Sequence, residues 1–303
     1  MLTKEQKGLI EKINKLKKEK NAVILVHNYQ RPEIYEIADF MGDSLELAKK
    51  ATETDAKIIV FCGVDFMAES AKILNPDKLV LHPSKLSICP MAQMVTKEQI
   101  LEMKVKHPKA VVVSYVNTTA EVKAVSDICC TSANAVKVVN SLKEGKVIFA
   151  PDKNLAIYVQ TKTDKKIIPV EGYCYVHDKI SAENVKKAKE NYPNAKVMIH
   201  PECRIDVIKL VDVVASTSQM LKYAKESPAK EFIVVTECGM VNALKKEIPD
   251  KTFYAVGGTC IQMKQITLDK VYDCLLNETN HIELEKGIME KAKKALQRML
   301  DVS

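Results

Sequence analysis

The sequence lacks the features that mark a membrane or secreted protein. It has no Trp and only 5% aromatic residues. Its apolar runs, such as AVILV (22–26) and IIVFC (58–62), are far shorter than the roughly 20 residues that cross a bilayer. The amino-terminal segment is typical of a charged helix and has neither the apolar core nor the cleavage site of a signal peptide. No Gly/Ser/Pro-rich linker occurs, so we predict a globular, cytoplasmic protein with no membrane partner.

The charge balance of the chain is mildly basic. The 46 Lys and Arg residues outnumber the 39 Asp and Glu residues, which leaves a formal charge of +7 spread along the sequence. Such a surplus suits anionic ligands. No basic block interleaved with aromatic residues stands out, so we do not expect nucleic acid as a partner. The 303 residues are enough for two or three domains, each with its own core.

The sequence contains nine cysteines, a feature that composition does not explain. The count is odd, and thiols inside cells stay reduced, so most should be buried apolar residues or metal ligands. No CxxC motif occurs, and the single CxxH is formed by Cys174 and His177. Any metal site must therefore be assembled from distant parts of the chain.

The chain repeats itself three times. Three strand-like apolar runs end in polar clusters at His27, Tyr115 and His200, which lie 88 and 85 residues apart. Other polar residues recur at matching offsets from these origins: Tyr29, Asn117 and Glu202; Asp39, Asp127 and Asp212; and the pairs Asp43-Ser44, Thr131-Ser132 and Ser216-Thr217. Triplication of a fold explains repeated strands and helices. It does not explain polar residues at matching offsets, which favour a shared functional site.

Each repeat predicts the same alternation of strands and helices. Continuous apolar strands separated by helices are typical of a parallel sheet covered on both faces. We therefore predict an α/β protein of three similar parallel-sheet αβα domains around a pseudo-threefold axis. The predicted domains are 1–90, 91–175 and 176–263, with the helices of 264–303 packing on the first domain.

One cysteine follows the last strand of each repeat. Cys89, Cys174 and Cys260 are 85 and 86 residues apart, and their thiols can converge if the three domains face one another. Three thiolates favour zinc or an iron–sulfur cluster. A cubane cluster held by three cysteines leaves one iron free to act as a Lewis acid. The other six cysteines are predicted to be structural: Cys62, Cys129, Cys130, Cys203, Cys238 and Cys274.

The polar clusters predict a ligand site at the strand ends, because ligands of open parallel sheets bind beyond the carboxyl ends of the strands. The hydroxyl pairs that end in Ser44, Ser132 and Thr217 each open a predicted helix. A helix start offers free amides and a positive dipole end, which suit phosphate or carboxylate. One such hydroxyl is more often a plain cap, but three at one repeat position favour an anion site. His177, three residues after Cys174, is expected near the cysteines.

A series of short motifs runs through the whole chain in order: HNYQ (27–30), GDSLELA (42–48), FCGVDFMAE (61–69), LNP (74–76), CPMA (89–92), YVNTTAEVKA (115–124), TSANAV (131–136), PDKNLA (151–156), EGYCYVH (171–177), HPEC (200–203), ASTSQM (215–220) and GGTC (257–260). As a set, these motifs resemble the quinolinate synthase family, the A protein of bacterial and archaeal NAD synthesis. The resemblance implies three α/β domains around a pseudo-threefold axis. It also implies a 4Fe–4S cluster bound by Cys89, Cys174 and Cys260.

The resemblance implies a reaction as well. The family condenses iminoaspartate with dihydroxyacetone phosphate to give quinolinate, with release of phosphate and water. A separate aspartate-oxidising enzyme is the implied functional partner. The implied substrate contacts are His27, Ser44, Tyr115, Val116, Asn117, Ser132, His200, Pro201, Glu202, Ser216 and Thr217. Tyr29 matches a tyrosine with an active-site role.

The residue chemistry fits this reaction. Among Tyr29, Asn117 and Glu202, only the glutamate ionises near neutrality, so Glu202 is the candidate general base. Tyr29, Tyr115 and His27 could donate protons or polarise carbonyls. We expect Glu202 and Tyr29 to move protons while the open iron assists the final dehydration.

Two other interpretations remain open at this stage. The diphthamide-forming radical enzymes, which cleave S-adenosylmethionine, also resemble three related domains that supply one cysteine each to a 4Fe–4S cluster. This sequence fits them less well, because HNYQ, YVN and HPEC suit a small, multiply anionic substrate. A non-enzymatic iron–sulfur sensor would leave the repeated His, Tyr and Ser positions unexplained.

Overall fold

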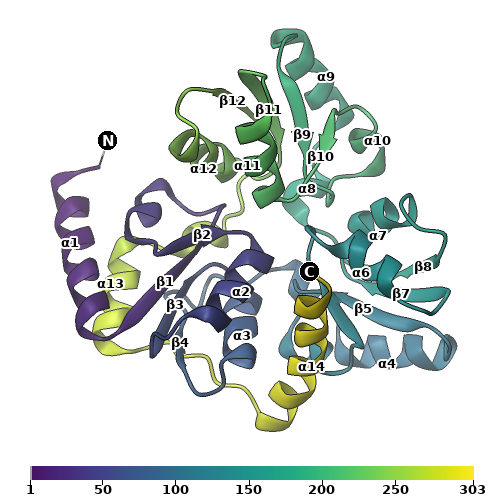
Figure 1. Ribbon diagram of the computed structural model, residues 1–303, viewed down its shortest axis with the longest axis horizontal. Coiled ribbons are helices and arrows are strands. Elements are labelled where there is room, and N and C mark those ends of the chain that lie inside the picture. The colour runs from purple at the N-terminus through teal and green to yellow at the C-terminus, as the bar shows by residue number, and fades with distance from the viewer. Residues whose placement is uncertain (1) are drawn as a thin grey trace.

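The computed structural model describes residues 2–303 and contains three parallel four-stranded sheets flanked by helices (Figure 1). The first sheet has the strand order β2-β1-β3-β4. Its strands are β1 (Ala22–His27), β2 (Phe40–Gly42), β3 (Ile58–Cys62) and β4 (Leu79–Leu81). Its helices are α1 (Lys4–Glu19), α2 (Ser44–Glu53) and α3 (Asp65–Leu74), with a 3₁₀ turn over Pro32–Ile37.

The second and third sheets repeat this order as β6-β5-β7-β8 and β10-β9-β11-β12. The second comprises β5 (Val111–Tyr115), β6 (Ile128–Cys130), β7 (Lys146–Ala150) and β8 (Lys166–Pro169), with α4 (Lys97–Lys106), α5 (Ala120–Ala124), α6 (Ala135–Ser141) and α7 (Lys153–Gln160). The third comprises β9 (Lys196–Ile199), β10 (Val213–Val214), β11 (Glu231–Val235) and β12 (Thr252–Val256), with α8 (Tyr175–Asp178), α9 (Ala182–Asn191), α10 (Ile205–Ile208), α11 (Thr217–Glu226) and α12 (Gly239–Glu247).

The three sheets form three lobes that meet near the centre of the molecule (Figure 1). All strand pairs named within the sheets are parallel, as continuous apolar strands separated by helices predict. The predicted α/β class with three similar αβα domains is confirmed.

The aspartates that recur at one offset in the repeats have a structural role. In each unit the carboxylate accepts a hydrogen bond from a backbone amide of the first strand: Asp39 from Ile24 at 2.8 Å, Asp127 from Val112 at 2.8 Å, and Asp212 from Val197 at 2.9 Å. Each aspartate therefore fastens the start of the short second strand to the first strand. Their recurrence reflects the fold rather than the ligand site.

The carboxyl-terminal helices α13 (Leu268–Asn277) and α14 (Lys286–Val302) occupy different places. Helix α13 packs on α1 of the first unit (Figure 1). Helix α14 instead lies mainly against α5 and β6 of the second unit, with a smaller contact to α3. This differs from the prediction that all of 264–303 packs on the first domain. The apolar face of α14, which includes the fully buried Leu296 and Met299, fills the seam between two units, and periodicity does not specify which surface such a face meets.

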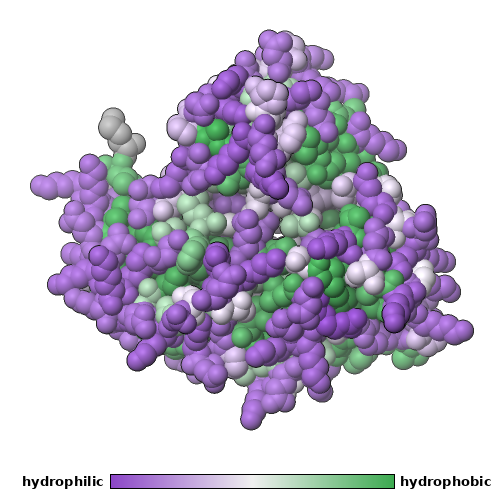
Figure 2. Space-filling model, viewed as in Figure 1, coloured by the Kyte–Doolittle hydropathy of each residue, from purple (hydrophilic) through white to green (hydrophobic). Residues whose placement is uncertain are grey.

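Hydrophilic side chains dominate the face drawn in Figure 2, where apolar residues show only in small separate areas. Within residues 2–303, the structure contains no helix with the length and apolarity that a membrane span requires. The larger apolar side chains are instead collected in cores beneath the helices, one of which runs through all three units.

Candidate functional site

Residues from all three units line one small cavity of about 80 Å³. The strand-end and helix-start residues in its lining are His27, Tyr29, Ser44, Tyr115, Asn117, Ser132, His200, Glu202 and Thr217. Cys89, Cys174 and Cys260 line the same cavity. Residues nearly 90 positions apart meet here because each follows the carboxyl end of a parallel strand, where loops of open sheets converge.

Three of the predicted contacts lie outside this lining. Val116 is buried and lines a smaller neighbouring cavity, and Pro201 is buried in the loop between two lining residues. Ser216 caps α11: its hydroxyl oxygen accepts the amide of Gln219 at 3.3 Å and its hydroxyl donates to Asp43 at 3.0 Å. The Ser216 hydroxyl thus both accepts and donates a hydrogen bond within the protein.

Two buried histidines face the cavity in their neutral form. The amide of Tyr29 donates to Nδ1 of His27 at 3.2 Å, so Nδ1 is unprotonated and the ring proton is on Nε2. In the same way, the amide of Glu202 approaches Nδ1 of His200 at 3.5 Å, and Nε2 of His200 lies 3.2 Å from the hydroxyl of Ser132. Burial lowers the pKa of each histidine to about 3, helped at His27 by Lys264. Both rings can therefore donate a hydrogen bond from Nε2 at neutral pH.

A chain of polar side chains joins the two tyrosines of the cavity. The hydroxyl of Tyr115 donates to Oε1 of Glu202 at 2.5 Å, and Oε2 of Glu202 lies 2.8 Å from Nδ1 of His177. On the other side of the ring, Nε2 of His177 is 2.8 Å from the hydroxyl of Thr236, which is 2.6 Å from the hydroxyl of Tyr29. The contact between His177 and Glu202 is close in distance, but Nδ1 of His177 has no hydrogen-bond partner in the described structure, so this link differs from the other hydrogen bonds.

Within this series of polar side chains, Glu202 carries the charge. Burial opposes its ionisation, but His177, His200 and the hydrogen bond from Tyr115 outweigh burial, so the pKa of Glu202 is lowered. Burial and the nearby Glu202 raise the pKa of Tyr115, which stays protonated at neutral pH. Glu202 is therefore a carboxylate that can accept a proton, and the tyrosines are donors.

The helix starts differ between the units. Ser44 and Thr217 are the first residues of α2 and α11, which are capped by Asp43 and Ser216. In these two units the predicted helix start is confirmed. In the second unit α6 begins only at Ala135, because the side chain of Asn134 accepts the amide of Thr131 and extends the turn. Ser132 thus lies in a turn ahead of the helix.

A carboxylate supports each of the three cavity cysteines. The amide of Cys89 donates to Asp65 at 2.9 Å, that of Cys174 to Asp152 at 2.8 Å, and that of Cys260 to Glu237 at 3.1 Å. The three carboxylates are 87 and 85 residues apart, so they occupy the same place in each repeat. Sequence reasoning missed them, although their repeat position was a signal that could have found them. All three thiols are free, and burial raises the pKa of each.

The donor atoms of the cavity fit a metal-containing group. Three thiols from three separate loops face one space, which is the donor set that zinc or an iron–sulfur cluster takes. Cys174, His177 and Glu202 also place a sulfur, a nitrogen and an oxygen within 4.8 Å of one another. Of the six remaining cysteines, five lie in apolar cores as predicted: Cys62, Cys129, Cys130, Cys203 and Cys274. Cys238 is half-buried, with its sulfur 3.1 Å from the hydroxyl of Thr259.

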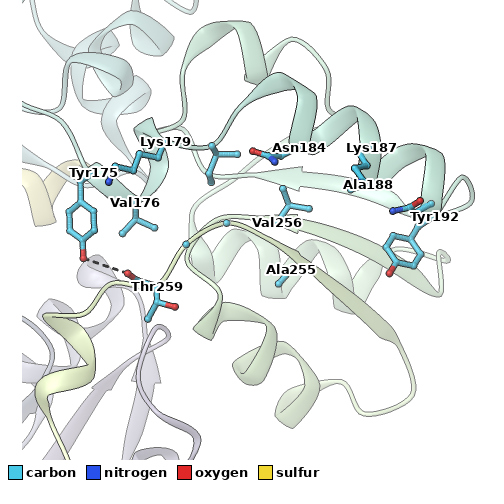
Figure 3. Close-up of a pocket in the computed structure, with 14 residues that line it drawn as sticks. Tyr175, Val176, Lys179, Asn184, Lys187, Ala188, Tyr192, Ala255, Val256 and Thr259 are labelled. Atoms are coloured by element: carbon cyan, nitrogen blue, oxygen red, sulfur yellow. Dashed lines mark hydrogen bonds between the residues drawn. The ribbon is translucent and has the colours of Figure 1, made fainter.

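A second and larger hollow of about 700 Å³ lies between α9 and β12 (Figure 3). Tyr175 and Thr259 stand at one end of it and Tyr192 at the other, with Lys179 and Lys187 as its charged residues (Figure 3). Its lining has none of the histidines, carboxylates or thiols of the smaller cavity. The smaller cavity is therefore the candidate active site, although the second hollow has the larger volume.

Comparison with known proteins agrees with this site. The family described as Quinolinate synthetase A protein matches residues 11–301. The chain belongs to this family. It is 54% identical over 300 residues to Quinolinate synthase 1 of Methanosarcina acetivorans, with 98% of this chain and 99% of the relative covered. It is 55% identical over 303 residues to Quinolinate synthase of Methanocaldococcus jannaschii (97% and 99% covered) and 51% identical over 311 residues to that of Aquifex aeolicus (100% and 97% covered).

Membership of the quinolinate synthetase A family decides between the interpretations left open by the sequence. The chain is an enzyme of NAD biosynthesis, and neither the radical enzyme nor the sensor is supported. Two residues of the cavity network had no assigned role from the sequence. His177 was placed only by its distance from Cys174, and Thr236 was not noticed, because a buried threonine after a strand has no pattern of its own.

The neutral state of His27 predicts a pH dependence of stability. Its pKa is about 3 in the folded protein and about 6.5 when unfolded, so below pH 6.5 only the unfolded chain takes up the proton. Stability should therefore fall as the pH drops from about 7 towards 4. In His27→Gln, urea unfolding under anaerobic conditions should show this fall reduced by up to about 1.4 kcal/mol per pH unit. A variant with the same pH slope as the wild type would contradict the neutral assignment.

Proposed function

We propose that this family member condenses iminoaspartate with dihydroxyacetone phosphate to form quinolinate, releasing phosphate and water. The observation that carries the proposal is the cavity itself. Three thiols, two neutral histidines, two tyrosines and one ionised glutamate from three units line a single small space. This combination suits a small anionic substrate that must lose several protons and hydroxyl groups.

The cavity cysteines would hold a 4Fe–4S cluster. Cys89, Cys174 and Cys260 are the proposed ligands, and the hydrogen bonds from their amides to carboxylates support the three loops that carry them. When bound by three cysteines, such a cluster supplies an iron without a protein ligand that acts as a Lewis acid. The thiols must lose their protons to bind metal, and in this cavity only the metal can offset the cost of burying three thiolates.

Anionic groups of the substrates would bind at the helix starts. Ser44 and Thr217 place a hydroxyl at the capped starts of α2 and α11, each ten residues long, where the helix dipole is positive. The Nε2–H groups of His27 and His200 add two further donors without adding positive charge. Asn117 brings a buried side-chain oxygen that has no partner in the described structure, so it can accept a hydrogen bond from the substrate.

Proton transfers would use the polar side chains that lie between Tyr115 and Tyr29. Glu202 is ionised and accepts a proton from the substrate, as a general base does. Tyr29 and Tyr115 hold their protons and can supply them to a departing hydroxyl or a developing oxyanion. Thr236 and His177 lie between Tyr29 and Glu202, and a small turn of the His177 ring would complete a path for the proton between them.

The proposal implies a supplier for the imine substrate. Iminoaspartate is an oxidised form of aspartate, so a separate aspartate-oxidising enzyme must provide it. We place the reaction in the cytoplasm, which is supported by nine free thiols that a reducing compartment preserves. Only small molecules are proposed as substrates.

Iron analysis after anaerobic purification tests the cluster. We expect about four irons per chain and quinolinate formation from the two substrates. Cys174→Ser should lose iron and activity, whereas Cys203→Ser should keep both, because Cys203 is buried in a core outside the cavity. Equal iron in the two variants would contradict the assignment of Cys174 as a ligand.

Glu202→Gln tests the general base. The amide keeps the size of the side chain but cannot take a proton, so the single-turnover rate should fall by about 10²–10⁴-fold with unchanged iron content. The matched control is Glu183→Gln on the exposed surface of α9, which should leave the rate unchanged. A near-normal rate in Glu202→Gln with intact iron would remove this role.

A further inference from the structure

A lysine with no exposed surface lies behind the cavity. Lys123 on α5 is 0% exposed, a costly place for an ammonium group without partners. Its Nζ donates to the backbone carbonyl of Thr118 and lies 5.6 Å from the centre of the Phe66 ring. Phe66 lines the cavity, so a single aromatic ring separates Lys123 from the substrate space. The proposed chemistry gives this lysine no role.

Lys123 forms no direct ion pair with a carboxylate among the described residues, and the main influence that favours its charge comes from another unit. Glu69 on α3 is the carboxylate that most favours the charged form of Lys123 and opposes the effect of burial on its pKa. Glu69 also accepts the amide of Ala120, the first residue of α5, at 3.0 Å. Lys123 and Glu69 therefore hold the two ends of the segment 118–120, one from the second unit and the other from the first.

This segment follows two residues of the cavity. Tyr115 ends β5, and Asn117 comes two residues later with a buried side-chain oxygen that has no partner in the described part of the chain. The hydroxyl of Thr118 donates to the carbonyl of Tyr115 at 2.9 Å, which closes the turn. The direction of the Asn117 side chain is thus set by β5 on one side and by the carbonyl that Lys123 holds on the other.

The first unit uses a related device at the same repeat position. Tyr35 corresponds to Lys123, and its buried hydroxyl donates to the carbonyl of Asn28 in the loop after β1, at 2.8 Å. The third unit has Ile208 at this position. At this repeat position only the second unit has a charged side chain, whereas in the first unit the loop is also held from elsewhere, by Lys264, whose Nζ donates to the carbonyl of Tyr29.

We propose that Lys123 is a positioning residue that fixes Asn117 in the cavity. Together with Glu69 it clamps the loop 115–120 across the seam between the first and second units. Lys123 acts through the Thr118 carbonyl and touches no substrate. That Asn117 contacts a substrate or product rests on the proposed function. That Lys123 and Glu69 hold the loop rests only on the contacts described above.

The test compares Lys123→Met, Glu69→Gln and the double variant, each purified anaerobically with its iron content measured. Removing one partner leaves the charge of the other buried, so each single variant should melt several degrees below the wild type. The double variant removes both charges and should recover most of the loss in Tm. Recovery would not restore the clamp, because methionine cannot donate to the Thr118 carbonyl.

Two readouts separate positioning from stability. The Kd for quinolinate should rise about ten-fold in Lys123→Met and stay raised in the double variant, because a misplaced side chain weakens binding even in a stable protein. Amide hydrogen exchange of the peptide spanning 116–120 should be faster in Lys123→Met and in the double variant than in the wild type. Lys106→Met, on the exposed surface of α4, is the matched control and should change neither readout.

The outcomes are distinct. A double variant that regains both Tm and quinolinate affinity would show a purely structural pair and overturn the proposal. Unchanged exchange in Lys123→Met would overturn it as well, and a double variant less stable than both single variants would contradict the charge pairing. If the wild type fails to bind quinolinate, the proposed function fails, and the exchange data still decide whether Lys123 holds the loop.

Discussion

The site depends on one repeated interaction, the hydrogen bond from a cysteine amide to a carboxylate of the same unit. Asp65, Asp152 and Glu237 follow the third strand of their sheets, and the cysteines follow the fourth. Both loops leave the same edge because the strands are parallel, so one side chain can join them. The backbone amide of each cysteine is thereby bonded to a neighbouring loop of the same unit. Three such bonds bring three thiols to one cavity, although no CxxC motif occurs.

Burial then gives the polar residues of the cavity different protonation states. It keeps His27 and His200 neutral, whereas the pKa of the buried Glu202 is lowered by His177 and by the hydrogen bond from Tyr115. One small cavity thus contains hydrogen-bond donors, an acceptor and thiols close together, at positions set by the strand ends. Behind the cavity, Lys123 and Glu69 form hydrogen bonds at the two ends of the segment that follows Asn117. The substrate space is shaped by groups that the substrate does not touch.

The repeat was the most informative part of the sequence. Apolar strands at a spacing of 88 and 85 residues predict three parallel sheets, and the structure contains them. Matching offsets also led to most of the residues that line the cavity, because a repeated fold returns equivalent positions to equivalent places. An offset cannot distinguish a helix cap from a ligand contact, and Ser216, which caps α11, stays a prediction as a substrate contact. Helix α14 was misplaced because an apolar face does not specify its partner surface.

Other features of the site could not be predicted from the sequence, for physical reasons. The contacts from Tyr29 to Glu202 through Thr236 and His177 join the first and third units with residues from three loops and helix α8. Such a network depends on how the units face one another to within a hydrogen-bond length, and no pattern along the chain carries that information. The buried Lys123 is similar, because its counter-charge comes from another unit.

The central claim is that three units hold one cluster with a single iron open to ligand. Mössbauer spectroscopy of anaerobic protein loaded with enriched iron, with and without quinolinate, tests it most directly. The account predicts a four-iron cluster in which about one quarter of the iron signal shifts when quinolinate binds. A four-iron signal that quinolinate leaves unchanged, or iron in another form, would contradict it.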